Sequence, residues 1–155
     1  MIKSHRGVAL VEFALILPML LLLTVITTEF GRAMYQYNSL AKSVRDASRY
    51  LSMQLPDTQI TQARNLVVHG NLAGTGPALV YGLTDAHVPN PTWQTEGPAP
   101  GITTVTVRVT GFTFQPMFSS VLGSQFISGT GVTFSEIRAT MRSHPLPGPP
   151  PAPAP

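Results

Sequence analysis

The first fifty residues carry two hydrophobic patterns in succession. Residues 8–26 are apolar and uncharged apart from Glu12, and residues 8–28 form a segment of 21 residues. At about 1.5 Å per residue, a helix of this length spans roughly the 30 Å hydrocarbon core of a bilayer. We therefore predict a transmembrane helix here. Pro18 is expected to bend this helix rather than end it, because freed carbonyl groups in membrane helices find other partners.

The apolar pattern changes after residue 28 but remains helical. Apolar positions recur at alternating steps of four and three residues, which is typical of an amphipathic helix, and Pro56 gives the stop. One helix is thus predicted from about residue 8 to about residue 53, with its charged residues on a solvated face. We expect its apolar stripe to pack under a globular module; the stripe consists of Phe30, Met34, Tyr37, Leu40, Val44 and Leu51.

The segment that follows the long helix has the composition of a small, turn-rich module. Asp57 or Thr58 is positioned to cap a short second helix, and Gly70 is positioned to end it. Residues 79–88 form a weak strand candidate, and the prolines and glycines that follow are typical of turns.

Two further segments alternate as β-strands do. In residues 102–114 valines alternate with threonines and an arginine, and residues 132–141 alternate in two phases, which predicts a bulge near Ser135 or Glu136. Residues 117–122 are expected to connect the two strands through a short apolar turn or helix. Antiparallel strands packed against an amphipathic helix make an α+β fold.

The sequence therefore predicts an α+β chain with a long N-terminal helix packed on a small antiparallel β module. The front half of the helix is the transmembrane half, and the back half is amphipathic. The last residues are almost entirely Pro, Ala and Gly, a composition that stays extended or disordered. The expected parts are a leader at residues 1–7, the transmembrane half at 8–28, the amphipathic extension at 29–55, the module at 56–144 and the Pro-rich tail at 145–155.

Composition narrows the classes of function. The formal net charge is +3, but Lys3 and Arg6 precede Gly7, and without them eight basic residues stand against seven acidic ones. No basic surface for nucleic acid is expected from this balance. The sequence has no cysteine, its four histidines are scattered, and it has neither a nucleophile elbow nor a phosphate-binding glycine loop. We therefore expect a protein that is not an enzyme, holds no metal or cofactor and binds no nucleic acid.

Glu12 is the residue of the membrane-length segment that most needs an explanation. A carboxylate inside a bilayer costs about 2.5 to 3.5 kcal/mol on insertion scales, so such a residue usually has a partner and a function. Glu12 is the fifth residue after Gly7, Phe13 follows it, and basic residues precede the glycine. This layout resembles a type IV prepilin leader. An ordinary signal peptide would have a shorter apolar core and a cleavage site of small residues.

A longer string makes the resemblance specific. The chain resembles the TadE-like proteins, the minor pilins or pseudopilins of the Flp/Tad tight-adherence pilus system, through Arg6-Gly7-Val8-Ala9-Leu10-Val11-Glu12-Phe13-Ala14-Leu15-Ile16-Leu17-Pro18, Glu29-Phe30-Gly31-Arg32 and Arg45-Asp46-Ala47-Ser48-Arg49-Tyr50. The resemblance implies that a prepilin peptidase cuts between Gly7 and Val8 and reads Phe13 as part of its motif. It also implies that Glu12 neutralises the new amino group of a neighbouring subunit.

The resemblance also sets the expected function, partners and location. The expected function is that of a minor pilin of a Tad/Flp type IV pilus, assembled through its N-terminal helix for pilus biogenesis and surface adhesion. Its expected partners are the prepilin peptidase, other pilin and minor pilin subunits, the inner-membrane assembly machinery and the lipid bilayer. Basic residues flank the apolar segment on both sides, so their count does not fix its orientation. The resemblance places the N-terminus in the bacterial cytoplasm, the helix in the inner membrane and the module outside it, then on the pilus or cell surface.

Two other classes of protein remain open from the sequence. One is an uncleaved single-pass scaffold or receptor module of the cell envelope, and the other is a membrane-anchored hydrolase. The intact mass of the membrane form separates the pilin from the scaffold, because only processing removes residues 1–7.

Overall fold

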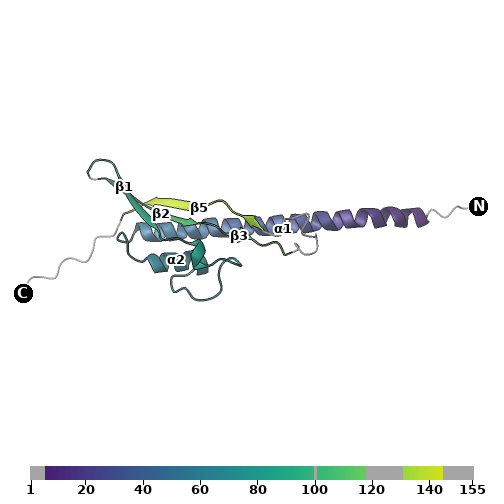
Figure 1. Ribbon diagram of the computed structural model, residues 1–155, viewed down its shortest axis with the longest axis horizontal. Coiled ribbons are helices and arrows are strands. Elements are labelled where there is room, and N and C mark those ends of the chain that lie inside the picture. The colour runs from purple at the N-terminus through teal and green to yellow at the C-terminus, as the bar shows by residue number, and fades with distance from the viewer. Residues whose placement is uncertain (1–5, 100, 118–130, 145–155) are drawn as a thin grey trace, which may run out of the picture. The chain divides into compact units, whose positions relative to one another are not determined.

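The computed structural model describes residues 6–99, 101–117 and 131–144 (Figure 1). Most of the expected leader, the Pro-rich tail and all but the first residue of the expected connection at 117–122 lie outside these ranges. The described residues form two α-helices, a short 3₁₀ helix and five strands. The α+β expectation is confirmed, since a long N-terminal helix packs on a small antiparallel sheet.

α1 is a continuous helix of 47 residues, Arg6–Ser52. Its sequence is rich in leucine and alanine, which have high helix propensity, and the helix continues through Pro18. It ends close to the predicted position. There the Met53 N–H donates to the Tyr50 carbonyl oxygen at 3.3 Å, which tightens the last turn and satisfies one of the terminal carbonyl groups.

α2 (Ile60–His69) is the second helix, and only its C-terminal end follows the prediction. The expected cap at Asp57 or Thr58 is wrong. Gln59 occupies the N-cap position without a side-chain hydrogen bond, and Asp57 and Gln59 both have positive φ, 60° and 55°. At the other end Gly70 has a φ of 73°, and its N–H donates to a carbonyl oxygen one turn back at 3.1 Å. Glycine adopts this left-handed stop without a side-chain clash.

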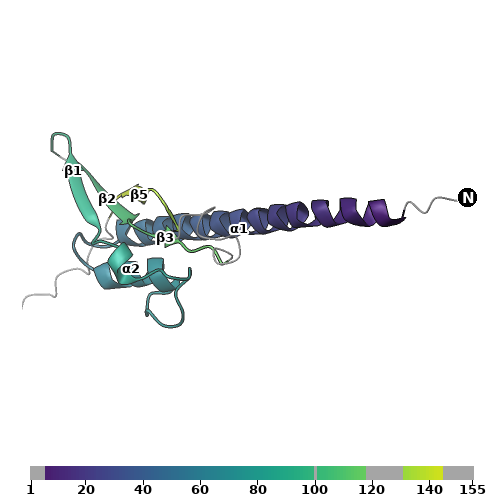
Figure 2. The ribbon, with the colours of Figure 1, turned by 45° about the vertical axis from the view of Figure 1, so that its right-hand side comes forward.

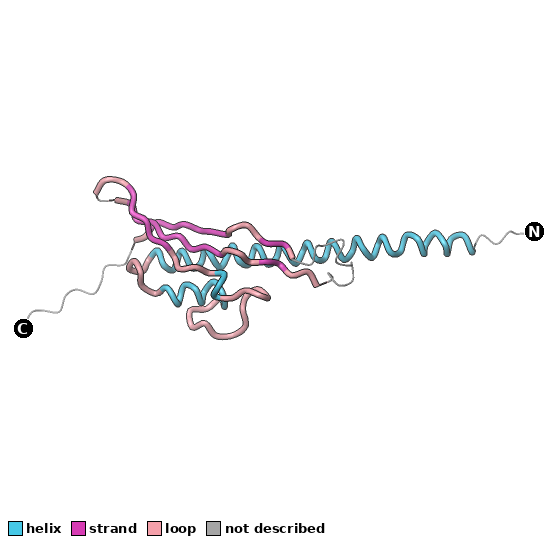
Figure 3. Tube along the Cα trace, viewed as in Figure 1, coloured by secondary structure: helices cyan, strands magenta, loops and turns pink. Residues whose placement is uncertain are grey.

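The main sheet has three antiparallel strands in the order β1-β2-β5 (Figure 3). β2 (Ile102–Val109) is central, with β1 (Thr92–Glu96) on one side and β5 (Ile137–Arg142) on the other. The sequence did not predict β1, because Trp93 is the one apolar residue in this short run and turn residues flank it. Pairing with β2 makes β1 a strand.

Both predicted strands are interrupted in the structure. The expected strand at 102–114 ends at Val109 and resumes as β3 (Thr113–Phe114). The expected strand at 132–141 divides into β4 (Val132–Thr133) and β5 rather than continuing through a bulge. β3 and β4 pair with each other as a separate two-stranded sheet.

The strand expected at residues 79–88 is wrong. These residues form turns and a 3₁₀ helix, η1 (Asp85–His87). Short-range bonds replace a strand ladder here: the Leu83 N–H donates to the Val80 carbonyl oxygen at 3.1 Å. The apolar side chains of this segment are buried although the segment is not a strand. Its sequence pattern therefore resembled that of a strand.

The chain divides into two compact units. The first comprises Met1–Tyr35 and Gln115–Val132, and the second comprises Gln36–Phe114 and Thr133–Pro155. α1 therefore contributes its N-terminal part to the first unit and its C-terminal part to the second.

The hydrophobic core lies in the second unit. The C-terminal part of α1, α2, the segment before β1 and the inner face of the sheet all contribute to it. α2 lies alongside this part of α1 in both ribbon views (Figures 1 and 2). Along β2 the valines are buried and alternate with partly exposed threonines, as the sequence pattern predicts. The largest fully buried residues are Leu40, Val44, Ser48, Leu51, Val67, Val88, Val105, Val107 and Val109.

The apolar stripe predicted along α1 is buried only from Leu40 onward. Exposed fractions are 0% for Leu40, Val44 and Leu51 but 67%, 45% and 39% for Phe30, Met34 and Tyr37. The expectation of one continuous buried stripe is therefore wrong at its start. Tyr37 still contacts Phe134 edge to face, with ring centroids 5.7 Å apart.

Candidate processing and assembly site

The N-terminal part of α1 exposes an extensive apolar surface. The exposed large apolar side chains between Val8 and Ile26 have exposed fractions from 36% at Leu22 to 75% at Met19. Water contact with so much apolar surface is unfavourable, and exposed patches of this kind mark sites for lipid or for another protein. A shallow apolar hollow on this surface is lined by Ile16, Met19, Leu20, Leu22, Leu23 and Ile26.

The same part of α1 is suited to a membrane by length and by its polar groups. Within the described ranges one helix, Gly7–Ser52, is long and apolar enough to cross a bilayer, and its most apolar window has a mean hydropathy of 2.6 and no buried residue. The hydroxyls of Thr24, Thr27 and Thr28 donate to carbonyl oxygens four residues earlier, at 2.8, 2.8 and 2.9 Å. Each hydroxyl thus has a partner inside the helix and needs no water.

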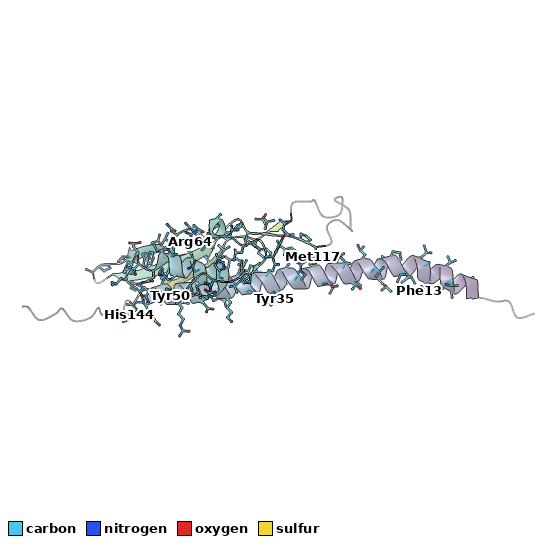
Figure 4. The ribbon with its side chains drawn as sticks, turned by 90° about the horizontal axis from the view of Figure 1, so that it is seen from below. Phe13, Tyr35, Tyr50, Arg64, Met117 and His144 are labelled. Atoms are coloured by element: carbon cyan, nitrogen blue, oxygen red, sulfur yellow. The ribbon has the colours of Figure 1, made fainter. Side chains whose placement is uncertain are left out.

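The residues of the leader motif lie at the start of this surface. Glu12 is exposed, and Val8 and Glu12 are four residues apart, so they share one face of α1. Phe13, which is 57% exposed, projects outward from the helix (Figure 4). The first turns of α1 thereby present the expected processing residues together, on a separate stretch of helix from the buried positions that begin at Leu40.

Gly7 is not explained by packing. Among the described residues, a methyl group on its Cα would meet no atom within 4 Å apart from the neighbouring helix backbone. Packing among the described residues therefore does not require a glycine at this position.

Glu29 is the polar residue that the structure adds to those predicted. It is 7% exposed, and its Oε2 accepts a hydrogen bond from Arg32 Nη1 at 2.7 Å in an ion pair. Its Oε1 accepts from the backbone N–H of Met117 at 2.9 Å. Glu29 therefore ties the start of the 115–132 segment to α1 within the first unit. The sequence shows the three-residue spacing of Glu29 and Arg32, but nothing local could reveal a partner 88 positions away.

A family model matches the segment that carries these residues. Residues 7–49 match the model of the TadE-like proteins. The N-terminal segment of this chain is TadE-like. The resemblance inferred from residues 6–50 is thereby confirmed, and the TadE-like segment contains Gly7, Glu12 and Glu29 together with the first buried positions of α1. Searches of curated proteins and of solved structures found no match to this chain.

The TadE-like family consists of pilus components rather than enzymes. In the part of the chain that the structure describes, no three His, Cys, Asp or Glu side chains gather as metal ligands. The TadE-like segment offers an apolar helix surface, an open glycine and an exposed carboxylate.

Proposed function

We propose that this chain is a minor pilin, or pseudopilin, of a Tad/Flp type IV pilus and acts in pilus biogenesis and surface adhesion. The observation that carries the proposal is the combination at the start of α1: an open Gly7, an exposed Glu12 and an exposed apolar surface of membrane length. The TadE-like match supports association with pilus subunits and with a membrane. The helix first anchors the subunit in lipid and then packs against other subunits.

Processing by a prepilin peptidase removes residues 1–7 by cutting between Gly7 and Val8. A glycine without packing neighbours among the described residues is consistent with this role, because the absence of a side chain lets a protease approach the backbone closely. Phe13 projects outward, where a peptidase that reads the motif can contact it. Val8 then carries a new positive charge at the start of an apolar helix.

Glu12 neutralises that new charge on a neighbouring copy. An unpaired ammonium or carboxylate in lipid or in a pilus core is costly, and pairing the two removes both costs. Because Val8 and Glu12 share one face four residues apart, Glu12 of one subunit reaches the Val8 amine of another that is shifted by about 6 Å along the helix axis. Assembly therefore favours one axial offset between subunits.

The proposed organisation follows from this assignment. The parts are a leader at 1–7, a transmembrane half at 8–28, an amphipathic extension at 29–55, an extracytoplasmic module at 56–144 and a Pro-rich tail at 145–155. Before assembly the N-terminus lies in the cytoplasm and the helix spans the bacterial inner membrane. The partners are the prepilin peptidase, other pilins and minor pilins, the inner-membrane assembly machinery and the bilayer.

The intact mass of the membrane form tests this function against an uncleaved scaffold or receptor module. A processed pilin loses residues 1–7 and begins Val8-Ala9-Leu10, whereas a scaffold keeps them. Gly7→Ala should slow the cut, because the added methyl crowds the scissile residue in the protease. Gly31→Ala is the matched control, since Gly31 is also a helical glycine with no described neighbour within 4 Å but lies far from the cut. A mature protein that still begins at Met1 in cells with an active Tad system would refute the proposal.

A further inference from the structure

The outward face of the main sheet carries three arginines that assembly through α1 does not use. Along β2 the buried valines alternate with Thr104, Thr106 and Arg108, which face outward. The register places Arg108 opposite Arg138 and Thr104 opposite Arg142. We call Arg108, Arg138 and Arg142 the arginine face.

The arginine face has no carboxylate of its own among the described residues. No Asp or Glu oxygen in the described ranges lies within 4 Å of these three guanidinium groups. Glu96 at the end of β1 and Glu136 just before β5 are exposed and form no ion pair with them. Arg108 and Arg138 stand directly opposite each other, and like charges in that position destabilise a sheet. An anionic partner would remove this repulsion.

β5 also has a free edge in the described part of the chain. The Ser143 N–H donates to the Thr103 carbonyl oxygen at 2.8 Å, so this pair is a hydrogen-bonded one. Bonded and non-bonded pairs alternate along an antiparallel ladder. Arg138, Thr140 and Arg142 therefore direct their backbone N–H and C=O groups away from β2. The side chains of the same three residues are exposed. Unused backbone groups and exposed guanidinium groups thus lie along one edge.

We propose that the edge of β5 binds an extended acidic segment of another protein, which adds to the sheet as a fourth strand. Arg138 and Arg142 are about 13 Å apart along the strand, so carboxylates four residues apart on the added segment lie opposite them. Guanidinium groups bind carboxylates through two parallel hydrogen bonds. Backbone pairing supplies affinity, and the arginines select acidic sequences. This interaction does not depend on processing after Gly7.

Other occupants fit the edge less well. If two copies of β5 paired about Thr140, Arg138 of one would lie opposite Arg142 of the other, which like charge opposes. Charged residues on an edge strand discourage such self-pairing. The outward positions of β1, β2 and β5 are Thr, Gln, Glu, Ile and Arg, so they offer no aromatic ring on which a sugar or a base could stack. An acidic protein segment is the partner that the face favours.

The test uses the full chain in non-ionic detergent and a fluorescent synthetic peptide, Thr-Glu-Val-Thr-Val-Glu-Thr. Its two glutamates are four residues apart and share one face of a strand. We expect saturable binding by fluorescence anisotropy, weakened about tenfold or more in Arg138→Gln/Arg142→Gln. The matched control is Arg45→Gln/Arg49→Gln, which removes the same charge from exposed positions on α1 and should change affinity less than about twofold.

Modified peptides separate strand addition from simple charge attraction. N-methylation of the second, fourth and sixth residues removes the N–H groups that face β5 and should abolish binding. N-methylation of the third and fifth residues, whose N–H groups face away, should be tolerated. Replacing both glutamates by glutamine should weaken binding as much as the arginine variant does.

Several outcomes would overturn the proposal. It fails if no peptide binds at millimolar concentration, or if both methylated peptides bind equally. It also fails if the two arginine variants lose affinity alike. Binding of an anionic polysaccharide such as polygalacturonate without binding of the peptide would assign the arginine face to a different class of partner. Self-association of the full chain that Arg138→Gln/Arg142→Gln strengthens and the peptide does not reverse would assign the edge to a second copy.

Discussion

Residues 8–26 and residues 40–51 belong to the same helix, yet they place their apolar side chains in opposite environments. In the first stretch the large apolar side chains are mostly exposed, and apolar residues surround the helix. In the second, Leu40, Val44 and Leu51 are fully buried, while the charged residues occupy the other face. A helix with an apolar stripe buries that stripe against its own chain. A helix that is apolar on all sides is buried by lipid or by another chain.

The two glutamates of the first unit differ in the same way. Glu29 is buried and bonded to Arg32 and to the backbone of Met117. Glu12 is exposed and has no hydrogen-bond or ion-pair partner among the described residues. Glu29 therefore belongs to the fold of the single chain. Glu12 lies on the exposed apolar surface of α1, and we propose that its partner belongs to another subunit.

The largest effect is expected at Glu12. If Glu12 pairs with the freed amine of Val8 on a neighbour, Glu12→Gln should still permit the cut after Gly7 but abolish incorporation into the pilus. The amide keeps shape and hydrogen bonding but loses charge, and the unpaired partner charge costs about 3 to 5 kcal/mol in a low-dielectric site. Mass spectrometry measures leader removal, and shearing followed by blotting measures incorporation.

Asp46→Asn is the matched control for that experiment, because Asp46 is an exposed acid on the amphipathic part of α1. It should be cut and incorporated normally. A Glu12→Gln protein that is cut and incorporated at the normal level would show that the carboxylate does not pair between subunits. The exposure of Glu12, in contrast to the burial of Glu29, would then have no role in assembly.

Truncating one leucine in each stretch tests the comparison directly. Leu40→Ala should lower the free energy of unfolding by about 2 to 5 kcal/mol, because it opens a cavity in the core. Leu15, which is 74% exposed, should give almost no change when truncated to alanine. Lys42→Ala, an exposed change next to the core, should also be nearly silent. Denaturant unfolding of the full chain in detergent, followed by circular dichroism, gives these values. Equal losses at Leu40 and Lys42 would argue against a core under α1.

Glu29→Ala should have a smaller and more local effect. It removes the acceptor of the Met117 N–H, a net loss of about 0.5 to 1.5 kcal/mol, because Met117 is exposed and water can replace the carboxylate. The ion pair with Arg32 adds little, because the guanidinium is partly solvated. Hydrogen exchange should show faster exchange at the Met117 amide and unchanged exchange in β2. Asp46→Ala is the control that should alter neither. Unchanged exchange at Met117 in Glu29→Ala would mean that the bond does not hold this segment.

The sequence predicted the parts of the fold that depend on neighbours along the chain. The length of α1 and the burial of Leu40 follow from periodicity, and the Gly70 stop follows from local backbone chemistry. β1 could not be predicted, because pairing with β2 creates it. In the candidate site, Gly7 and Glu12 can be identified from their spacing in the sequence alone. The bond from Glu29 to Met117 and the alignment of three arginines depend on which distant segments of the chain meet, and no local sequence pattern predicts that.

Two glycines give the smallest effects, and the expected effects have opposite signs. Gly31 lies in α1, and no described residue comes within 4 Å of an added methyl, so Gly31→Ala should stabilise the helix by about 0.5 to 1 kcal/mol. Gly70 has a φ of 73°, and an added methyl would lie 2.9 Å from Leu79 Cδ2, so Gly70→Ala should destabilise the second unit by about 1 kcal/mol. Hydrogen exchange around residue 31 measures the effect of Gly31→Ala, and denaturant unfolding measures the effect of Gly70→Ala. If Gly31→Ala stabilises the free subunit but lowers incorporation into pili, the glycine is needed for close packing against another subunit. The part of α1 that packs against other subunits would then extend past the membrane-length segment. Normal incorporation of the stabilised variant would show that the part of α1 that packs against other subunits ends before residue 31.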